Sequence, residues 1–440
     1  MSIRTYAVKG RGRLREHLDQ PMRRTSYHLL TNAALSSSLG FLYWLVAARL
    51  FPAEVVGRAG ALVSAMALFA LIGQLNLSGA LMRFLPVAGK RRSRLIVGTY
   101  LVAVAVAMTS AIVTLSIIKV VDPRSSLNLP VGDAVVLCVS VGLWVIFILE
   151  DNVLIGLRRT QWIPIENSTF GIAKILLLAV FAVCLPRSAM ALFVTSVLPL
   201  VVICPIINAL IFRVAIPRAR AGDPAHLKPN FSGFRKFVIG DAAGGLLFQG
   251  WSNVLPILVA VMLGGAANAL FYVAFLISTT LDLLPATLTS ALVVEAASTP
   301  DRAQELVRST VRRMAWMLAG AVTLGVVLAP WLLRLYGGHY SNGTLLLRIL
   351  LLSSIAKASI VLFLGICRIE GRTHLGAAAW GAVFASVIIL SIVLGRTDGV
   401  NGVGFAVLLS TGWVGVFCAV GTMRYLRRAP VRPQSVLTQD

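Results

Sequence analysis

The sequence predicts an all-α polytopic membrane protein with about twelve transmembrane helices arranged as two six-helix lobes. The chain of 440 residues is 58% hydrophobic and only 13% charged, whereas a soluble domain has about 25% charged residues. Its mean hydropathy is +0.85, and apolar stretches of about 20 residues recur along its whole length. These observations exclude a soluble globule, a disordered chain and a coiled coil.

Each expected helix is an apolar stretch long enough to cross a bilayer, with polar or basic residues on either side. The 27 residues before the first stretch are too polar and basic to insert. The expected helices cover residues 28–48, 59–82, 95–118, 133–156, 163–185, 189–212, 237–263, 267–294, 314–334, 344–366, 375–395 and 402–424. An even number of spans puts both termini on the same side of the membrane.

The basic residues set the orientation. With the N-terminus inside, the inner segments hold 30 of the 40 lysines and arginines and the outer segments hold 8. Short cytoplasmic loops carry such an excess, so we expect both termini to be cytoplasmic. The net charge of +23 is then explained by membrane anchoring, and we expect membrane lipids but no nucleic acid as partners.

The loops divide the chain into two halves. Residues 213–236 form the longest inner loop, which is basic and contains three prolines. We therefore expect a basic N-terminal segment (1–27), an N-lobe (28–212), a cytoplasmic linker (213–236), a C-lobe (237–424) and a cytoplasmic tail (425–440). Residues 50–57 and 262–269 occupy equivalent turns of the two halves, a weak repeat typical of transporters that bind cargo between lobes.

Ionisable residues inside expected spans are the first candidates for a functional site. Lys174, Asp282 and Lys357 lie near the centres of their spans. Asp282 and Lys357 either form an ion pair that fixes helix packing or line a polar cavity. Lys174 either pairs with Glu150 or Asp151 or faces the cavity.

Other polar residues suggest the walls of a water-accessible cavity. Span 237–263 contains the polar residues Asp241, Gln249, Ser252 and Asn253, of which Asp241, Gln249 and Ser252 recur at about helical spacing and so share a face. Gln74, Asn76 and Ser78 form a similar stripe in span 59–82, although hydrogen bonds between helices are an alternative role for each. Pro285, just beyond Asp282, predicts a kink.

The sequence lacks the motifs that we would expect of an ATP-driven pump, a metalloprotein or an enzyme. It has no G-x-x-x-x-G-K-[ST] motif for ATP binding and no clustered histidines and cysteines for a metal. The acidic residues of the expected outer loops are dispersed over short turns, which disfavours a membrane glycosyltransferase. We therefore expect no enzymatic activity and no cofactor, with proton or sodium coupling left open.

Several segments resemble bacterial polysaccharide-biosynthesis membrane proteins, the O-antigen type flippases of lipid-linked oligosaccharides. These belong to the multidrug/oligosaccharidyl-lipid/polysaccharide exporter superfamily. The similar segments are residues 45–57, 76–86, 154–167, 266–274 and 292–295.

This resemblance implies two lobes that alternate between inward-open and outward-open states in the bacterial plasma (inner) membrane. The cargo would be a polyprenyl-phosphate- or diphosphate-linked glycan for lipopolysaccharide or another cell-envelope polysaccharide, and glycan polymerases or glycosyltransferases are possible partners. The resemblance implies cationic cavity residues that meet phosphate, for which Arg49, Arg83, Lys174 and Lys357 are the candidates, with a snorkelling membrane anchor as the alternative role of Arg83. The polar stripes add Gln74, Gln249 and Asn253 to the expected cavity.

The resemblance also suggests where a coupling ion would bind. The candidates for coupling or gating are Glu150, Asp151, Asp241 and Asp282. Related multidrug exporters hold a cation on carboxylates of the seventh, eighth and tenth helices, but here the tenth carries Lys357. That difference argues against a sodium site there, because a lysine paired with Asp282 would replace the cation.

Two other transporter classes remain as alternatives. A cation-coupled multidrug extruder would share the architecture, but lysines at the middle of the membrane disfavour cationic drugs as cargo. A major-facilitator carrier would need an acidic G-x-x-x-D element between the second and third helices, where the sequence has Gly89-Lys90-Arg91-Arg92.

Overall fold

The computed structural model describes residues 21–121, 128–184, 186–221 and 234–427, and this part of the chain is helical without strands. It contains ten helices that are long and apolar enough to cross a membrane. The predicted all-α, multi-pass membrane fold is therefore confirmed.

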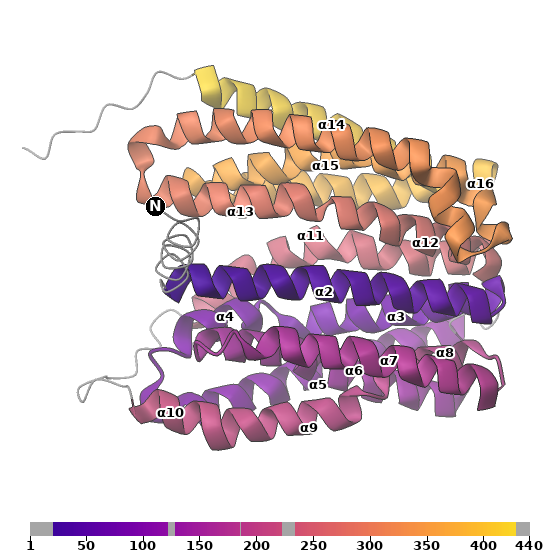
Figure 1. Ribbon diagram of the computed structural model, residues 1–440, viewed down its shortest axis with the longest axis horizontal. Coiled ribbons are helices and arrows are strands. Elements are labelled where there is room, and N and C mark those ends of the chain that lie inside the picture. Colours follow the sequence, from indigo (N-terminus) through magenta and orange to yellow (C-terminus); the bar gives the residue numbers. More distant parts are fainter. Residues whose placement is uncertain (1–20, 122–127, 185, 222–233, 428–440) are drawn as a thin grey trace, which may run out of the picture. The chain divides into compact units, whose positions relative to one another are not determined.

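The first half of the chain forms a series of antiparallel helices (Figure 1). They are α2 (Pro21–Leu50), α3 (Ala53–Gln74), α4 (Leu77–Phe84), η1 (Gly89–Arg91), α5 (Arg92–Val121), α6 (Val131–Gly156), α7 (Trp162–Cys184), α8 (Ala189–Val197), α9 (Leu200–Leu210), the π-helical turn η2 (Ile211–Ala215) and α10 (Ile216–Ala221). The sixth expected span, 189–212, is thus built from α8 and α9 and ends in the π-helical turn.

The second half begins with α11. Its elements are α11 (Phe234–Leu263), α12 (Gly265–Leu281), α13 (Leu283–Ser298), η3 (Pro300–Arg302), α14 (Ala303–Tyr336), η4 (Gly338–Gly343), α15 (Thr344–Ile369) and α16 (Thr373–Arg427). The 55 residues of α16 contain a non-helical glycine, Gly399 (φ 58°, ψ −135°), so that two helices meet there. These two helices correspond to the expected spans 375–395 and 402–424.

Two expected spans are interrupted in the structure. Span 59–82 breaks where Leu75 (φ 42°) and Asn76 (φ 59°) adopt left-handed conformations, which asparagine tolerates better than most residues. The predicted stripe of Gln74, Asn76 and Ser78 on one continuous helix is therefore wrong. Instead, Ser78 Oγ donates to Gln74 Oε1 across the break, at 3.2 Å.

The second interruption divides span 267–294 at Asp282. This residue ends α12 and precedes α13, and Pro285 lies in the first turn of α13, where a missing N–H costs little. The kink predicted at Pro285 lies beside this one-residue interruption between α12 and α13.

The chain forms two compact units. Residues up to 241 make up most of the first unit and residues from 242 make up most of the second, while residues 48–68 group with the second. The expected boundaries of lobes, linker and tail stay predictions, and residues 1–20, 222–233 and 428–440 lie outside the described residues.

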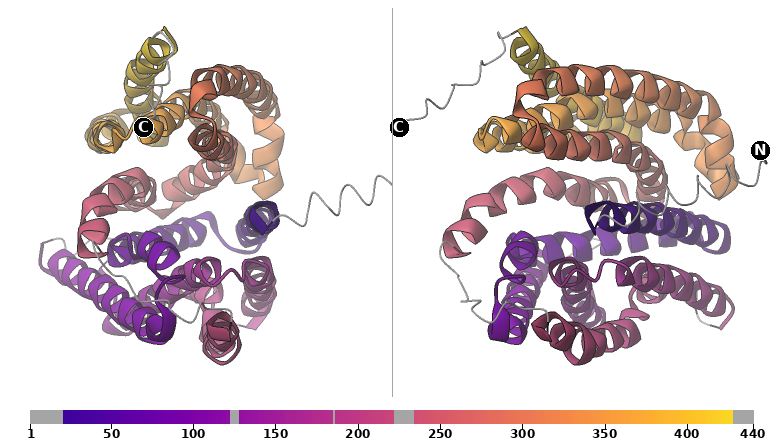
Figure 2. Two further views of the ribbon diagram at one scale, coloured as in Figure 1. Left: turned by 90° about the vertical axis from the view of Figure 1, so that its left-hand side faces the viewer. Right: turned by 60° about the vertical axis from the view of Figure 1, so that its left-hand side comes forward.

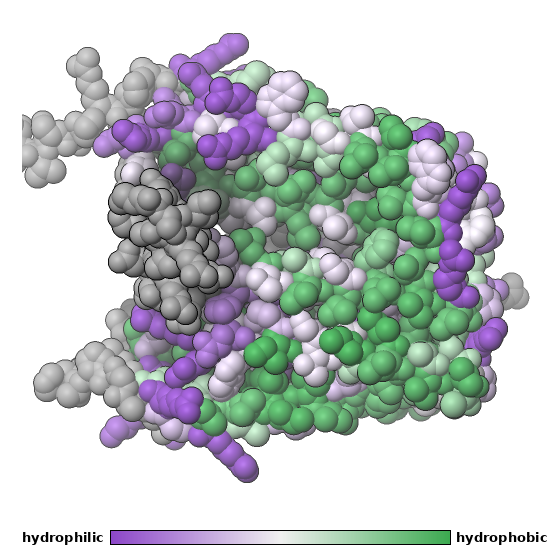
Figure 3. Space-filling model, viewed as in Figure 1, coloured by the Kyte–Doolittle hydropathy of each residue, from purple (hydrophilic) through white to green (hydrophobic). Residues whose placement is uncertain are grey.

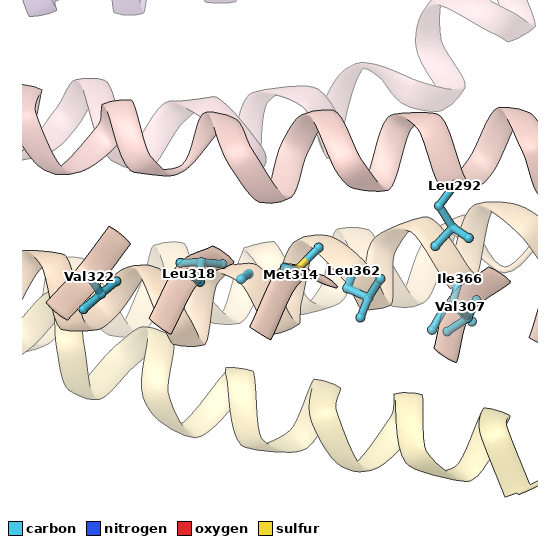
Figure 4. Packing of buried hydrophobic residues seen from close by; sticks show 8 residues of the cluster. Leu292, Val307, Met314, Leu318, Val322, Leu362 and Ile366 are labelled. Carbon is cyan, nitrogen blue, oxygen red and sulfur yellow. The ribbon is translucent and has the colours of Figure 1, made fainter. Parts of the chain in front are cut away.

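The helices of each unit pack side by side in a bundle (Figure 2), and in each unit one helix contacts at least four others. In the first unit α6 packs against α4, α5, α8 and α9, and in the second unit α15 packs against α12, α13, α14 and α16. Apolar side chains of α13, α14 and α15 form a core in the second unit (Figure 4). Val307, Met314, Leu318 and Val322 contribute one face of α14 to this core because they lie at helical spacing.

Many large apolar side chains are exposed on the described helices. Examples are Leu101, Val183, Trp316 and Phe417, which are 66%, 86%, 78% and 75% exposed. On the visible face of the molecule, apolar residues cover the middle of the helices and polar residues gather toward their ends (Figure 3). An exposed apolar surface of this kind requires a lipid environment.

Candidate functional site

Lys174 projects from the middle of α7 toward two aromatic rings. Its Nζ lies 5.0 Å from the ring centroid of Tyr43 on α2 and 5.1 Å from that of Phe170 on α7. Tyr43 is held in place because its hydroxyl donates to the Leu192 carbonyl at 3.0 Å and lies 2.8 Å from Thr195 Oγ1. These contacts are cation–π interactions, which attract a cation without neutralising its charge.

The two carboxylates considered as partners of Lys174 have other partners. Asn167 Nδ2 donates to Asp151 Oδ1 and Oδ2 at 3.3 and 3.2 Å, and Asn208 Nδ2 donates to Glu150 Oε1. Within the described part of the chain, Lys174 forms no salt bridge. Among the described residues, the half-buried side chain of Lys174 is thus contacted by aromatic rings and forms no salt bridge with a carboxylate.

Lys357 and Asp282 form the ion pair that was one of the two alternatives. Lys357 Nζ lies 2.6 Å from Asp282 Oδ2, and the lysine side chain is 3% exposed while the aspartate side chain is 26% exposed. The pair joins the centre of α15 to the α12–α13 break. The second aspartate oxygen, Oδ1, is buried without a hydrogen-bond partner.

A cluster of aromatic side chains meets the same lysine through Trp251. Lys357 Nζ lies 5.9 Å from the ring centroid of Trp251 on α11. Trp251 stacks on Trp380 of α16, with centroids 6.4 Å apart and an interplanar angle of 13°, and contacts Phe275 edge-on at 5.9 Å. The two candidate lysines thus share an aromatic setting and differ in that only Lys357 has a described carboxylate partner.

The two candidate arginines lie at helix ends. Arg49, exposed in the last turn of α2, donates from Nε to the Leu335 carbonyl at 2.6 Å and from Nη2 to the Arg334 carbonyl at 3.1 Å. It therefore caps the last carbonyls of α14. Arg83 is exposed in the last turn of α4, 5.5 Å from the ring centroid of Phe84.

The polar candidates of α11 bond mainly to their own helix. Ser252 Oγ and Asn253 Nδ2 donate to the main-chain carbonyl of Gln249, at 2.8 and 3.1 Å, while the Gln249 side chain is exposed. The side chain of Asp241 lies outside the described residues, so its place on the same face stays a prediction.

Sequence reasoning missed one member of a group of acidic side chains in the first unit. Glu150 on α6 and Glu166 on α7 are 0% and 2% exposed. Glu166 was treated only as part of a similar segment, yet it is a carboxylate inside the expected span 163–185. That signal alone would have placed it among the candidates.

Clusters of potential metal ligands are absent from the described residues. These residues contain no group of three or more histidine, cysteine, aspartate or glutamate residues that could hold a metal ion. All five cysteines are free thiols, of which Cys184 is exposed and the other four are buried.

Comparison by sequence finds no match for this chain, whereas comparison by structure finds solved proteins with a similar fold. No protein-family profile and no curated protein matches the chain. A multidrug resistance MATE family transporter of the MOP superfamily, in an inward-facing conformation, superposes with a TM-score of 0.70 at 14% identity, over 90% of this chain and 94% of that one.

Two further solved structures show the same similarity. The lipid II flippase MurJ, in an inward closed conformation, gives a TM-score of 0.65 at 14% identity, covering 90% of this chain and 87% of that one. A MOP superfamily transporter from Pyrococcus furiosus gives 0.59 at 13% identity, covering 92% and 96%. The chain therefore has the two-lobed fold of MATE transporters and MurJ.

Proposed function

We propose that this protein is an alternating-access transporter that flips a polyprenyl-phosphate- or diphosphate-linked oligosaccharide across the bacterial plasma membrane, for cell-envelope polysaccharide biosynthesis. The fold supports transport rather than catalysis, since the similar solved structures are transporters and a flippase. The observation that carries the choice of cargo is the ammonium of Lys174 at the middle of α7, which forms no salt bridge with any residue that the structure describes.

The physical argument concerns the charge of the cargo. A lipid-linked glycan has a phosphate group at the junction between tail and sugar, and moving this anion into a low-dielectric region without a counter-charge is very costly. An ammonium that the protein leaves without a carboxylate balances that charge at intermediate depth. The electrostatics of Lys174 therefore favour an anionic head group over a cationic drug.

The test is a flipping assay with the purified protein in proteoliposomes and a fluorescent polyprenyl-diphosphate oligosaccharide. Lys174→Ala should slow flipping by about 10- to 150-fold, because a hydrogen bond to a charged group contributes about 1.5–3 kcal/mol. Lys174→Arg should retain most of the activity, because the positive charge remains.

Lys119→Ala is the matched control. Lys119 is an exposed lysine in the last turn of α5, so its removal changes the net charge equally without touching the candidate site. Flipping by Lys174→Ala at the rate of the Lys119→Ala variant would overturn the assignment of Lys174 as the phosphate partner.

A multidrug extruder is the second candidate, and the aromatic group around Lys357 is the observation that favours it. Stacked Trp251 and Trp380 with Phe275 offer flat apolar faces suited to planar organic molecules. Efflux of a planar dye from cells or proteoliposomes, combined with no flipping of the lipid-linked glycan, would select this function.

A further inference from the structure

Two glutamates from neighbouring helices lie buried together in the first unit. Glu150 is on α6 and Glu166 on α7, with exposures of 0% and 2%, and the two carboxyl groups are close enough to interact. Helix α6, which carries Glu150, packs against most helices of this unit, and α7, which carries Glu166, is one of its neighbours. Such a pair is expensive to bury and needs compensation.

The hydrogen bonds in the structure compensate only part of this cost. Asn208 Nδ2 of α9 donates to Glu150 Oε1, whereas Glu150 Oε2 and both oxygens of Glu166 are buried without a hydrogen-bond partner. Glu166 lies close enough to Glu150 for the two carboxyls to share a hydrogen bond, and it also interacts with Asp151. If both carboxyls of the pair were ionised, that contact would become a repulsion between two buried negative charges.

The charged and titratable groups around the pair do not supply a cation. Asp151 of α6, Tyr100 of α5 and Cys204 of α9 interact with one or both glutamates. Among the residues that the structure describes, no lysine, arginine or histidine forms a salt bridge with either glutamate. The three named neighbours are all acids, so deprotonation of both glutamates would add repulsion that none of them compensates.

We propose that Glu150 and Glu166 form a proton-binding site in which the two carboxyls hold one exchangeable proton between them. When the proton is bound, one carboxyl donates a hydrogen bond and at most one negative charge is buried. When it leaves to water, two carboxylates face each other across the α6–α7 packing, and repulsion favours an arrangement that separates or hydrates them.

The protonation state of this pair affects how α6 and α7 pack against each other. Loss of the proton biases the packing of α7, the helix that also carries Lys174, against α6. Coupling between this proton and cargo movement rests on the proposed transport function, whereas the existence of the proton site does not. The two statements are therefore tested separately.

Infrared difference spectroscopy of the full chain in proteoliposomes tests the proton site without any cargo. At neutral pH the wild-type protein should show the C=O stretch of a protonated carboxyl group that shifts in D₂O and disappears at alkaline pH. Glu150→Gln and Glu166→Gln should each remove that pH-dependent band, and either variant suffices if the other does not fold.

Two control variants assign the band. Glu54→Gln changes an exposed glutamate paired with Arg58 at 2.6 Å, and Asp151→Asn changes the neighbouring acid; both should keep the band. Absence of the band in the wild type, or its persistence in both glutamine variants, would overturn the proposal.

A transport measurement then tests coupling. An imposed pH gradient should accelerate flipping by the wild-type protein, and Glu166→Gln should lose that acceleration while keeping wild-type binding of the lipid-linked glycan. Acceleration by a sodium gradient but not by a pH gradient would overturn the coupling role. Failure of flipping in all variants would refute the proposed function and leave the infrared result intact.

Discussion

The ion pair between Lys357 and Asp282 shows how one buried charge constrains its surroundings. The lysine is 3% exposed, and its Nζ contacts one aspartate oxygen at 2.6 Å. Removing one partner of such a pair leaves the other without compensation, whereas replacing both by apolar residues is often tolerated. Comparing a single with a double substitution of this pair therefore shows whether Lys357 and Asp282 serve helix packing or transport.

We expect Lys357→Met to lower the free energy of unfolding by about 3 kcal/mol, because it leaves Asp282 partly buried and unpaired. The double variant Lys357→Met/Asp282→Leu should recover most of this loss. Unfolding in mixed detergent micelles measures both. A double variant as unstable as the single one would show that the carboxylate is not what destabilises the single variant.

The flipping assay separates the two roles. If the stable double variant flips cargo at the wild-type rate, the pair serves packing alone. If it is folded and inactive, the pair belongs to the transport machinery, as its position at the middle of α15 suggests.

At the scale of elements, α3 and α12 approach each other closely near the two turns whose sequences echo each other. Their N-terminal ends meet at Gly57 and Gly265 within the second unit. A Cβ on Gly57 would overlap the Gly265 carbonyl oxygen, and a Cβ on Gly265 would lie 2.7 Å from the Glu54 carbonyl oxygen. Asn268 Nδ2 donates to the Gly57 carbonyl at 2.7 Å, which ties the two helices together.

Gly57→Ala should therefore lower the melting temperature of the detergent-solubilised protein, because the added methyl group must push the two helices apart. Gly40→Ala is the matched control: Gly40 is also within a helix, and a Cβ there would meet no atom within 4 Å. Equal melting temperatures for the two variants would contradict the close approach at Gly57.

At the scale of the whole molecule, the positions of the helices do not show which end of each helix faces the cytoplasm. The distribution of lysine and arginine predicts that both termini are cytoplasmic, which puts the end of α7 on the outer side. Cys184, the last residue of α7, is exposed, and the other four cysteines are buried.

A membrane-impermeant maleimide should consequently label the unmodified protein from outside intact cells or spheroplasts. Cys184→Ser should abolish that labelling. In the Cys184→Ser background, Lys90→Cys, which introduces an exposed thiol in η1, should react only after the membrane is opened. Labelling with the opposite sidedness would reverse the predicted topology.

The sequence determined the fold class, an all-α, multi-pass membrane protein. It predicts twelve spans, whereas the described residues contain ten helices long and apolar enough to cross a membrane, of which α16 joins two expected spans at Gly399. Apolar length decides whether a segment crosses a bilayer, and this property is local to each segment. The helix break beside Pro285 was predictable for the same reason, since proline acts on its own turn. The break at Leu75 and Asn76 was not, because nothing in that apolar stretch requires left-handed residues.

For the candidate site, the sequence predicts which charged residues are buried but not which residues they contact. The sequence marked Lys174, Asp282 and Lys357 because a charge in an apolar span is costly wherever it lies. Only the tertiary structure decided that Asp282 neutralises Lys357, that Lys174 meets Tyr43 and Phe170 instead of a carboxylate, and that Glu166 joins Glu150. Partners of a buried charge lie on helices distant in sequence, so their identity depends on how the helices pack.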